Sequence, residues 1–293
     1  MKVVLVGEGM LELSSDGASW HLGHGGDTLN IAIHLARTGM ATSFLSALGS
    51  DPFSQKLRSD WALEGVDTSL ILTHPSRAPG MYAITTDPRG ERSFTYWRND
   101  SAVRDMLGCP GAESAFTVAE SADLLGFSLI TLAVLSSAAR ERLLHAATQV
   151  RRHGGRVMFD GNYRPRLWSS VAEAQRMRDA AIACADIGLP TLDDEALLSG
   201  ATDAESVAHH WMELGCRETV VKLGAHGCRL PDGTTIAPPK VLEPVDTSGA
   251  GDAFDAGYLN ARLRGSSIAE AAMAGHRLAG WCVMRRGAIP ARD

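Results

Sequence analysis

The residues best suited to chemistry lie near the C-terminal end, in the run Asp246-Thr-Ser-Gly-Ala-Gly-Asp252. Gly249, Ala250 and Gly251 are small and precede an apolar segment, so this run is expected to be a loop that enters a helix. The first amides of a helix lack partners within it and lie at the positive end of its dipole, where they can bind a phosphate. A carboxylate at Asp252 would repel a phosphate but can accept a proton from a hydroxyl that attacks it. Together these groups suit phosphoryl transfer.

A second glycine-rich run, Gly25-Gly26-Asp27-Thr28-Leu29-Asn30, also opens an apolar helical segment. Two glycines let a ligand approach the backbone closely, and the side chains of Asp27 and Asn30 can bind hydroxyl groups. Each run taken alone is also compatible with an ordinary helix start, because Asp is a common N-cap and Gly a common loop residue. Several polar groups that face one small molecule would indicate a polyol site.

Composition excludes several classes of function. The chain has 293 residues, of which 45% are hydrophobic, and a net charge of -6, which disfavours nucleic acid and acidic membranes as partners. Five scattered cysteines without CxxC spacing, and no apolar stretch of the ~20 residues that a membrane span needs, predict a reduced, cytoplasmic protein. Neither a GxxxxGK[ST] motif nor a GxGxxG motif after the first strand is present, which argues against P-loop enzymes and dinucleotide dehydrogenases.

Predicted strands alternate with predicted helices along most of the chain. The strands are expected at 2–7, 41–48, 66–72, 124–131, 155–160, 186–189 and 219–223, and the helices at 28–38, 52–64, 137–152, 171–184, 204–214, 250–263 and 268–285. This alternation predicts a doubly wound, mainly parallel α/β sheet with helices on both faces. Ligands of such sheets bind beyond the carboxyl ends of the strands, so the motifs that follow the strands should meet in one crevice.

Two further segments, at about 10–24 and 79–99, show short apolar alternation broken by turn residues at Asp16-Gly17 and Asp87-Pro-Arg-Gly90. They predict hairpins that form a separate, half-exposed β-sheet, a lid, inserted into a single domain of residues 1–293. The alternative is that they are edge strands of the main sheet.

The motifs together resemble a known family. Thr247-Ser-Gly-Ala-Gly-Asp252-Ala-Phe is similar to the C-terminal signature of the PfkB (ribokinase-like) carbohydrate kinases, and Gly25-Gly26 with Asn30 resembles their N-terminal sugar-binding signature. Their order and spacing hold over the full length. The resemblance implies an ATP- and Mg²⁺-dependent sugar kinase, with a monovalent cation such as K⁺ as a further cofactor.

Within that family, Gly80-Met-Tyr82, Tyr96-Trp97-Arg98-Asn99 and the run from Asp160 to Trp168 are similar to the hallmarks of 2-keto-3-deoxygluconate kinases. A sugar acid as substrate also suits the arginines, because a guanidinium pairs with a carboxylate through two hydrogen bonds. Arg98 and Arg164 are the candidates, although either can instead form a surface salt bridge, and Arg164 can bind phosphate alone. A kinase for fructose, ribose or a nucleoside, and a non-catalytic sugar-binding relative, remain alternatives.

The resemblance implies a role for each matching residue. Asp252 would be the catalytic base, and the amides of Gly249, Ala250 and Gly251 would form the anion hole. The sugar would be held by Gly25, Gly26, Asp27, Asn30, Tyr82, Tyr96, Arg98 and Arg164, and the nucleotide by Asn162, Arg164, Asp194, Lys222, Gly224, Gly227, Gly249 and Gly251.

One departure concerns the metal. Many members carry Asn-x-x-Glu where this chain has Thr191-Leu-Asp-Asp194. Asp194 is therefore expected to hold Mg²⁺ through a water molecule.

The predicted lid is rich in aromatic residues, which are Tyr82, Phe94, Tyr96 and Trp97. A monomer would leave part of this apolar sheet uncovered. Two lids that pack together would cover it, so a homodimer through the lid is expected, with higher oligomers left open.

Overall fold

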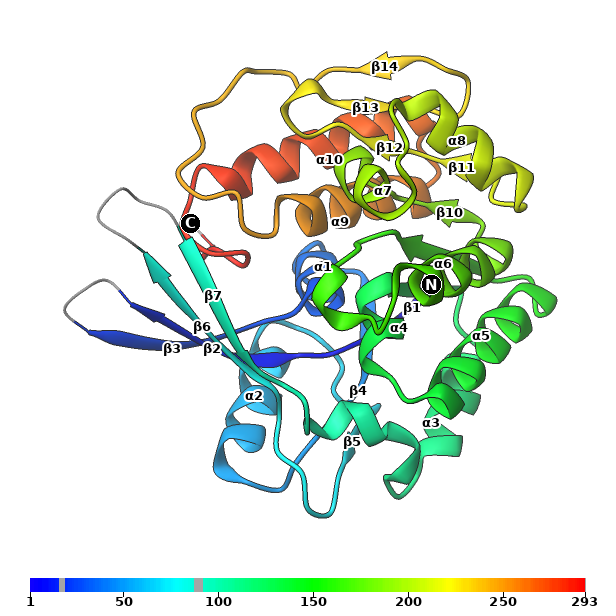
Figure 1. The fold of residues 1–293 in the computed structure, drawn as a ribbon. Helices are drawn as coiled ribbons and strands as arrows, with labels where there is room; N and C mark the ends of the chain where they lie inside the picture. The colour runs from blue at the N-terminus through cyan, green and yellow to red at the C-terminus, as the bar shows by residue number, and fades with distance from the viewer. Residues whose placement is uncertain (16–18, 87–91, 293) are drawn as a thin grey trace.

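A seven-stranded parallel sheet forms the centre of the computed structural model, which describes residues 1–15, 19–86 and 92–292 (Figure 1). The strand order is β11-β10-β9-β8-β1-β4-β5. The strands are β1 (Lys2–Val6), β4 (Ala41–Leu48), β5 (Ile71–Thr73), β8 (Leu124–Ser128), β9 (Arg156–Asp160), β10 (Ile187–Gly188) and β11 (Glu218–Thr219). The predicted parallel sheet is confirmed.

Helices cover both faces of this sheet because its strands are apolar on both sides. Successive strand residues point to opposite faces, so Val3 and Leu5 of β1 enter one core while Val4 and Val6 enter the other. The first core includes α1 (Asp27–Arg37), α2 (Pro52–Leu63), α9 (Ala250–Leu263) and α10 (Ile268–Val283). The second includes α3 (Ala112–Ala119), α4 (Leu129–Val134), α5 (Ser137–Arg152), α6 (Val171–Cys184), α7 (Leu192–Ser199) and α8 (Ala204–Glu213).

The lid is a separate sheet of four strands that projects from the body (Figure 1). Its order is β3-β2-β6-β7, with β2 (Met10–Ser15), β3 (Trp20–Gly25), β6 (Met81–Thr86) and β7 (Arg92–Trp97). In the described part of the chain no lid strand pairs with the seven-stranded sheet, which rules out the edge-strand alternative. The predicted turns at Asp16-Gly17 and at Asp87 to Gly90 lie outside the described residues.

A small antiparallel sheet, β12 (Val221–Lys222), β13 (Cys228–Arg229) and β14 (Thr235–Ile236), lies beside α10. The predicted strand 219–223 is therefore divided: Thr219 ends β11 in the main sheet, and Lys222 belongs to the small one. The predicted strand 66–72 is wrong over most of its length, because Asp67 makes only an isolated bridge to Ser43. No helix of the described residues is long and apolar enough to cross a membrane.

Candidate active site

The two glycine-rich runs meet at the carboxyl edge of the main sheet. The Asn30 side chain on α1 donates a hydrogen bond from Nδ2 to Oδ2 of Asp252 on α9 at 2.7 Å, across 222 positions of sequence. The turns after β1 and β9 reach the same place, where the Asn162 side chain donates to Asp27 at 3.3 Å. Asn162, expected to contact the nucleotide, thus touches a residue expected to hold the sugar.

The environment of Asp252 favours a base that works near neutral pH. Its side chain is buried, with 8% of it exposed. Burial raises the pKa of Asp252 to about 7, and the nearby carboxylates of Asp27 and Asp160 add to this, while Asn30 and Lys222 oppose it. A base whose pKa lies near the working pH combines correct ionisation with useful proton affinity.

The loop before α9 is shaped to receive an anion. Gly249 is the N-cap of α9, has a positive φ of 68°, and makes no side-chain cap hydrogen bond. The Ala250 amide donates to the Thr247 carbonyl at 3.3 Å, whereas in the described part of the chain the amides of Gly251 and Asp252 make no hydrogen bond. Two amides at a helix start therefore face a place where an anion can bind.

The C-terminal segment fixes this loop from behind. The Asp246 carboxylate accepts hydrogen bonds from the Ser248 amide at 2.9 Å and the Gly287 amide at 2.6 Å. Gly249 lies directly against Ala288, since a Cβ at Gly249 would stand 2.6 Å from the Cβ of Ala288. The position of the anion-binding amides thus depends on contacts with residues 287–288.

Beneath the loop lies a buried ammonium group held by two carboxylates. Lys222 Nζ donates to Asp160 Oδ1 at 3.1 Å and to Asp255 at 2.9 Å (Oδ1) and 3.1 Å (Oδ2). Burial lowers the pKa of Lys222, but the two carboxylates outweigh it, so the pKa is raised above its usual value. The sequence indicated Lys222 but not its partners; the only hint was that Asp255 lies one helical turn after Asp252.

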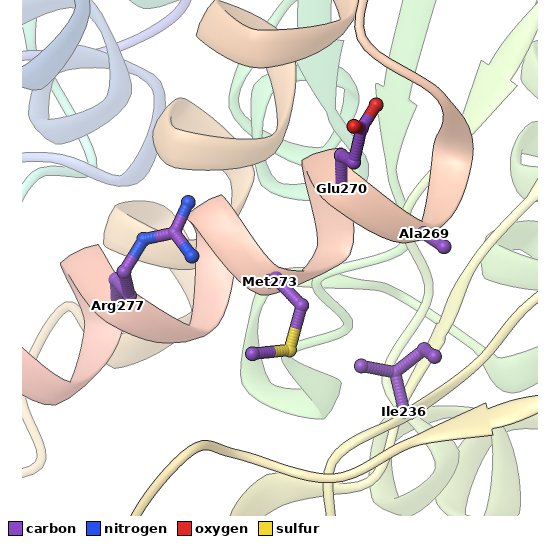
Figure 2. Close-up of a pocket in the computed structure, with 5 residues that line it drawn as sticks. All are labelled: Ile236, Ala269, Glu270, Met273 and Arg277. Atoms are coloured by element: carbon purple, nitrogen blue, oxygen red, sulfur yellow. The ribbon is translucent and has the colours of Figure 1, made fainter.

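Of the residues expected to hold the nucleotide, Lys222 lines a hollow of about 410 Å³, together with Leu192, Asp193, Leu223 and His226. The turn over it contains Gly224 and Gly227, which both have positive φ angles, and the Gly227 amide donates to the Gly224 carbonyl at 3.2 Å. Another hollow, of about 340 Å³, lies between α10 and β14 and contains no predicted site residue (Figure 2).

Arg164 and Asp194 form an ion pair, with Nη1 to Oδ1 at 3.1 Å. Half of the Arg164 side chain is exposed, whereas Asp194 is mostly covered. Burial raises the pKa of Asp194, and Arg164 partly offsets this effect. The pair brings a half-exposed cation and a candidate metal-binding carboxylate together near Asp160 and Lys222.

The lid brings the predicted Arg98 to the sugar side, but not as a free cation. Its guanidinium is buried and forms an ion pair with the buried carboxylate of Glu8, which follows β1. The carbonyl of Glu8 lies against Gly26, and its side chain lies against Gly80, so a Cβ at either glycine would clash. Glu8 could not be predicted from the sequence, because one carboxylate after a strand carries no distinguishing signal.

The two lid tyrosines differ in their surroundings. The Tyr82 hydroxyl donates to Glu12 and lies against Gly25, whereas Tyr96 is half exposed. Their rings lie 5.8 Å apart between centroids, and the Arg98 guanidinium carbon is 5.8 Å from the Tyr96 ring centroid. Tyr82, Tyr96 and Arg98 therefore form one contiguous group.

Comparison with known proteins agrees with the fold. Residues 2–293 match the pfkB family of carbohydrate kinases. The chain is 41% identical to the 2-dehydro-3-deoxygluconokinase of Dickeya dadantii over 98% of this chain and 96% of that protein, and 41% identical to the Escherichia coli K12 protein of the same name over 100% and 98%.

Solved structures agree as well. The Salmonella enterica aminoimidazole riboside kinase, complexed with aminoimidazole riboside and an ATP analogue, superposes with a TM-score of 0.83 at 26% identity, over 99% of this chain and 95% of that one. A PfkB protein from Polaromonas sp. JS666 gives a TM-score of 0.85 at 27% identity, over 97% and 96%.

Proposed function

This chain belongs to the PfkB family of carbohydrate kinases, and we propose that it transfers the γ-phosphoryl group of ATP to the terminal hydroxyl of 2-keto-3-deoxygluconate, also called 2-dehydro-3-deoxygluconate. The observation that carries the mechanism is the position of Asp252. It is a buried carboxylate whose pKa is raised to about 7, in the first turn of α9, where the amides of Gly251 and Asp252 make no hydrogen bond in the described part of the chain. The proposed base and the proposed anion site therefore lie next to each other in the first turn of α9.

In the proposed reaction Asp252 accepts the proton of the terminal hydroxyl of the sugar. The hydroxyl oxygen forms the new bond to the γ-phosphorus, and the bond between that phosphorus and the ADP oxygen breaks. The amides of the Gly249–Gly251 loop hold the transferred phosphoryl group. The base is expected to supply ~10²–10⁴ in rate. The rest comes from positioning and from charge stabilisation by fixed donors.

We assign the sugar to the space between the start of α1 and the lid. The start of α1 would contribute Gly25, Gly26, Asp27 and Asn30, and the lid would contribute Tyr82 and Tyr96. The carboxylate is assigned to Arg98 and Arg164, whose guanidinium groups keep further N–H donors after pairing with Glu8 and Asp194. Asn162, Asp194, Lys222, Gly224 and Gly227 are assigned to ATP.

The metal ligands present fit Mg²⁺ bound mainly by phosphates. Mg²⁺ commonly takes one or two carboxylates and completes its shell with water and substrate oxygens. The described residues contain no cluster of three His, Cys, Asp or Glu side chains that suits a metal, so Asp194 is the proposed single contact. When bound, Mg²⁺ neutralises phosphate charge. K⁺ is assigned to the carbonyl oxygens of Ser248, Gly287 and Ala288, each of which lies within 3.9 Å of Cys282 Sγ.

The proposed function is tested by ADP release with Mg-ATP and a panel of 2-keto-3-deoxygluconate, fructose, ribose and adenosine. Turnover with the keto acid, exceeding that with each neutral substrate at least tenfold, is expected. Preference for a neutral sugar would overturn the assignment of the carboxylate to the arginines but not the phosphoryl-transfer site. Absence of turnover with all four would favour a non-catalytic sugar-binding protein.

The arginine assignment needs a variant that leaves no unpaired charge. Arg98→Ala alone would leave the buried Glu8 carboxylate without its ion-pair partner. An unpaired buried charge is expected to destabilise the fold. The double variant Glu8→Gln, Arg98→Met keeps the local charge balanced. It should raise KM for the keto acid about 10- to 100-fold and change KM for ATP less than about threefold. An unchanged KM for the keto acid would remove Arg98 from substrate recognition.

We also propose that the protein works in the cytoplasm as a homodimer joined through its lids. The exposed apolar side chains of the lid support the dimer. Trp20, Phe94, Tyr96 and Trp97 are each at least 40% exposed although they belong to one small sheet.

A further inference from the structure

The buried bridge between Lys222, Asp160 and Asp255 does more than hold the fold together. Resting on the proposed function, we propose that Lys222 donates a hydrogen bond to the transferred phosphoryl group from beneath the anion site, and that Asp160 and Asp255 are the positioning residues that aim it there. The same bridge places its positive charge beside the base Asp252. Asp255 and Asp160 thereby acquire roles in turnover without touching substrate.

The position of the ammonium supports this inference. A Cβ placed on Gly251 would lie 3.7 Å from Lys222 Nζ, so the ammonium lies next to Gly251, whose amide makes no hydrogen bond in the described part of the chain. The side chain of Lys222 also lines the hollow assigned to ATP. Lys222 therefore lies next to both the hollow assigned to ATP and the anion site assigned to the transferred phosphoryl group.

The hydrogen bonds of the ammonium leave room for a ligand. An ammonium group has three donors. One serves Asp160, and the two oxygens of Asp255, at 2.9 and 3.1 Å, are close enough together to share a second. The third donor is then available to an anion above Gly251.

Stability alone does not account for such a bridge. Its three residues come from different elements, β9, β12 and α9, and each is at least 92% covered. Burying charges costs solvation energy, and well-packed apolar side chains often stabilise such a position as well or better. A buried cation between two carboxylates beside an anion site is instead what preorganised electrostatic catalysis requires.

Lys222 is also the cation that faces the base. The groups around Asp252 are Asp27 and Asn30 from α1, Asp160 from β9, Lys222 from β12, Asp255 from its own helix, Tyr82 from the lid and Cys282 from α10. Burial raises the pKa of both Tyr82 and Cys282, so these two stay neutral near pH 7. Of these groups, Lys222 lowers the proton affinity of the base by charge, and the carboxylates raise it.

Three variants separate this role from a structural one. Lys222→Met gives the bridge a net charge of -2, Asp255→Asn a net charge of 0, and the double variant the original -1. Under the proposal the double variant regains the thermal stability that Lys222→Met loses, but its kcat stays about 10²–10³-fold below that of the wild type. Recovery of kcat to within about threefold would show that Lys222 only balances charge, and would overturn the proposal.

The pH profile adds a readout that damage to packing does not produce. The acid limb of kcat/KM reports the ionisation of the base in the free enzyme. It should move to higher pH in Lys222→Met and to lower pH in Asp255→Asn. Asp255→Asn retains an amide oxygen that can still accept from Lys222, so it keeps the fold and tests the positioning role by itself. Shifts of the same sign in both variants would contradict the electrostatic role.

Binding of nucleotides without sugar separates this proposal from the proposed substrate. By calorimetry, the double variant should bind ATP at least about tenfold more weakly, while its affinity for ADP changes less than about threefold, because only ATP places a phosphoryl group at the anion site. Equal losses for ATP and ADP would overturn the proposal. Neither outcome depends on which sugar the enzyme accepts, so a failure of the substrate panel leaves this measurement decisive.

Discussion

At the scale of single residues, the role proposed for Asp252 opposes stability. A carboxyl group usually titrates near pH 4, but burial raises the pKa of Asp252 to about 7. Above pH 7 the folded protein therefore holds an ionised carboxylate that its surroundings disfavour, whereas the unfolded chain ionises it freely. Between pH 7 and 4 this penalty fades, because the folded group takes up a proton.

Asp252→Asn is accordingly expected to lose activity and gain stability. Turnover should fall about 10²–10⁴-fold, since the amide cannot accept the proton. The variant should unfold at a higher temperature than the wild type at pH 8, and this gain should disappear as the pH falls to 4. Thermal unfolding at several pH values, with ADP release at pH 8, measures both effects.

Asp203→Asn is the matched control for this prediction. Asp203 caps α8 by accepting from the Ser206 amide at 2.7 Å, and this hydrogen bond lowers its pKa. Asn also caps helices well, so activity should stay unchanged and no stability should be gained at pH 8. Full turnover in Asp252→Asn would show that Asp252 is not the base. Equal unfolding temperatures of the wild type and Asp252→Asn at pH 8 would show that the fold does not disfavour the ionised carboxylate.

Residue types indicated the candidate reactive groups, but not their partners. Asp252, Gly249 and Lys222 could be selected from spacing and scarcity, since helix starts and lone lysines stand out in this sequence. Glu8 and Asp255 could not, because carboxylates are common and their significance lies in contacts with Arg98 and Lys222. Those contacts join segments that are distant in sequence, so only the fold defines them.

At the scale of elements, the start of α9 depends on one glycine. Gly249 has a φ of 68°, a conformation that costs an L residue roughly 1–2 kcal/mol, and a Cβ there would press on Ala288. Gly249→Ala should therefore lower stability by more than this strain alone and reduce kcat at least about tenfold by displacing the anion-binding amides. Chemical denaturation and ADP release measure the two losses.

Gly265→Ala separates strain from displacement. Gly265 follows the other end of α9, has a φ of 92°, and a Cβ there would meet nothing within 4 Å. The substitution should carry the same conformational cost and leave kcat unchanged. A similar kcat in the two variants would show that the Ala288 contact does not position the anion site.

Elements with strong end signals could be predicted closely, and weak ones could not. The predicted helices 171–184 and 250–263 agree with α6 and α9 at both ends, because caps and glycines mark their limits. Helix α3 was missed, since its N-cap is Gly111, which offers no side-chain cap, and the helix has only eight residues. The two-residue strands β10 and β11 show no periodicity, so their pairing follows from their neighbours alone.

At the scale of the whole molecule, chain order explains why the site could be anticipated. In a parallel sheet every strand delivers its following turn to the same edge. The turns after β1 and β9 and the starts of α1 and α9 therefore meet, although their residues span most of the chain. The separate sheet of the lid was also predictable, from the alternation of apolar and polar residues. The ion pair between Arg98 and Glu8 was not.

The lid also leads to a prediction about assembly. Leu22 and Phe94 are 39% and 40% exposed, and they lie on opposite faces of the lid sheet. Leu22 pairs with Leu13, which pairs with Ala83, whereas Phe94 pairs with Ile84, the next residue along β6, and successive strand residues point to opposite faces. Apolar side chains on both faces of a small projecting sheet are typical of a surface that a second molecule covers.

The double variant Leu22→Ser, Phe94→Ser should therefore shift the protein from dimer to monomer in sedimentation velocity at about 10 µM. Leu63→Ser is the control, because Leu63 is 86% exposed on α2, outside the lid, and its loss should leave the dimer intact. A wild-type monomer at this concentration, or a dimer that survives the double variant, would exclude the lid as the interface.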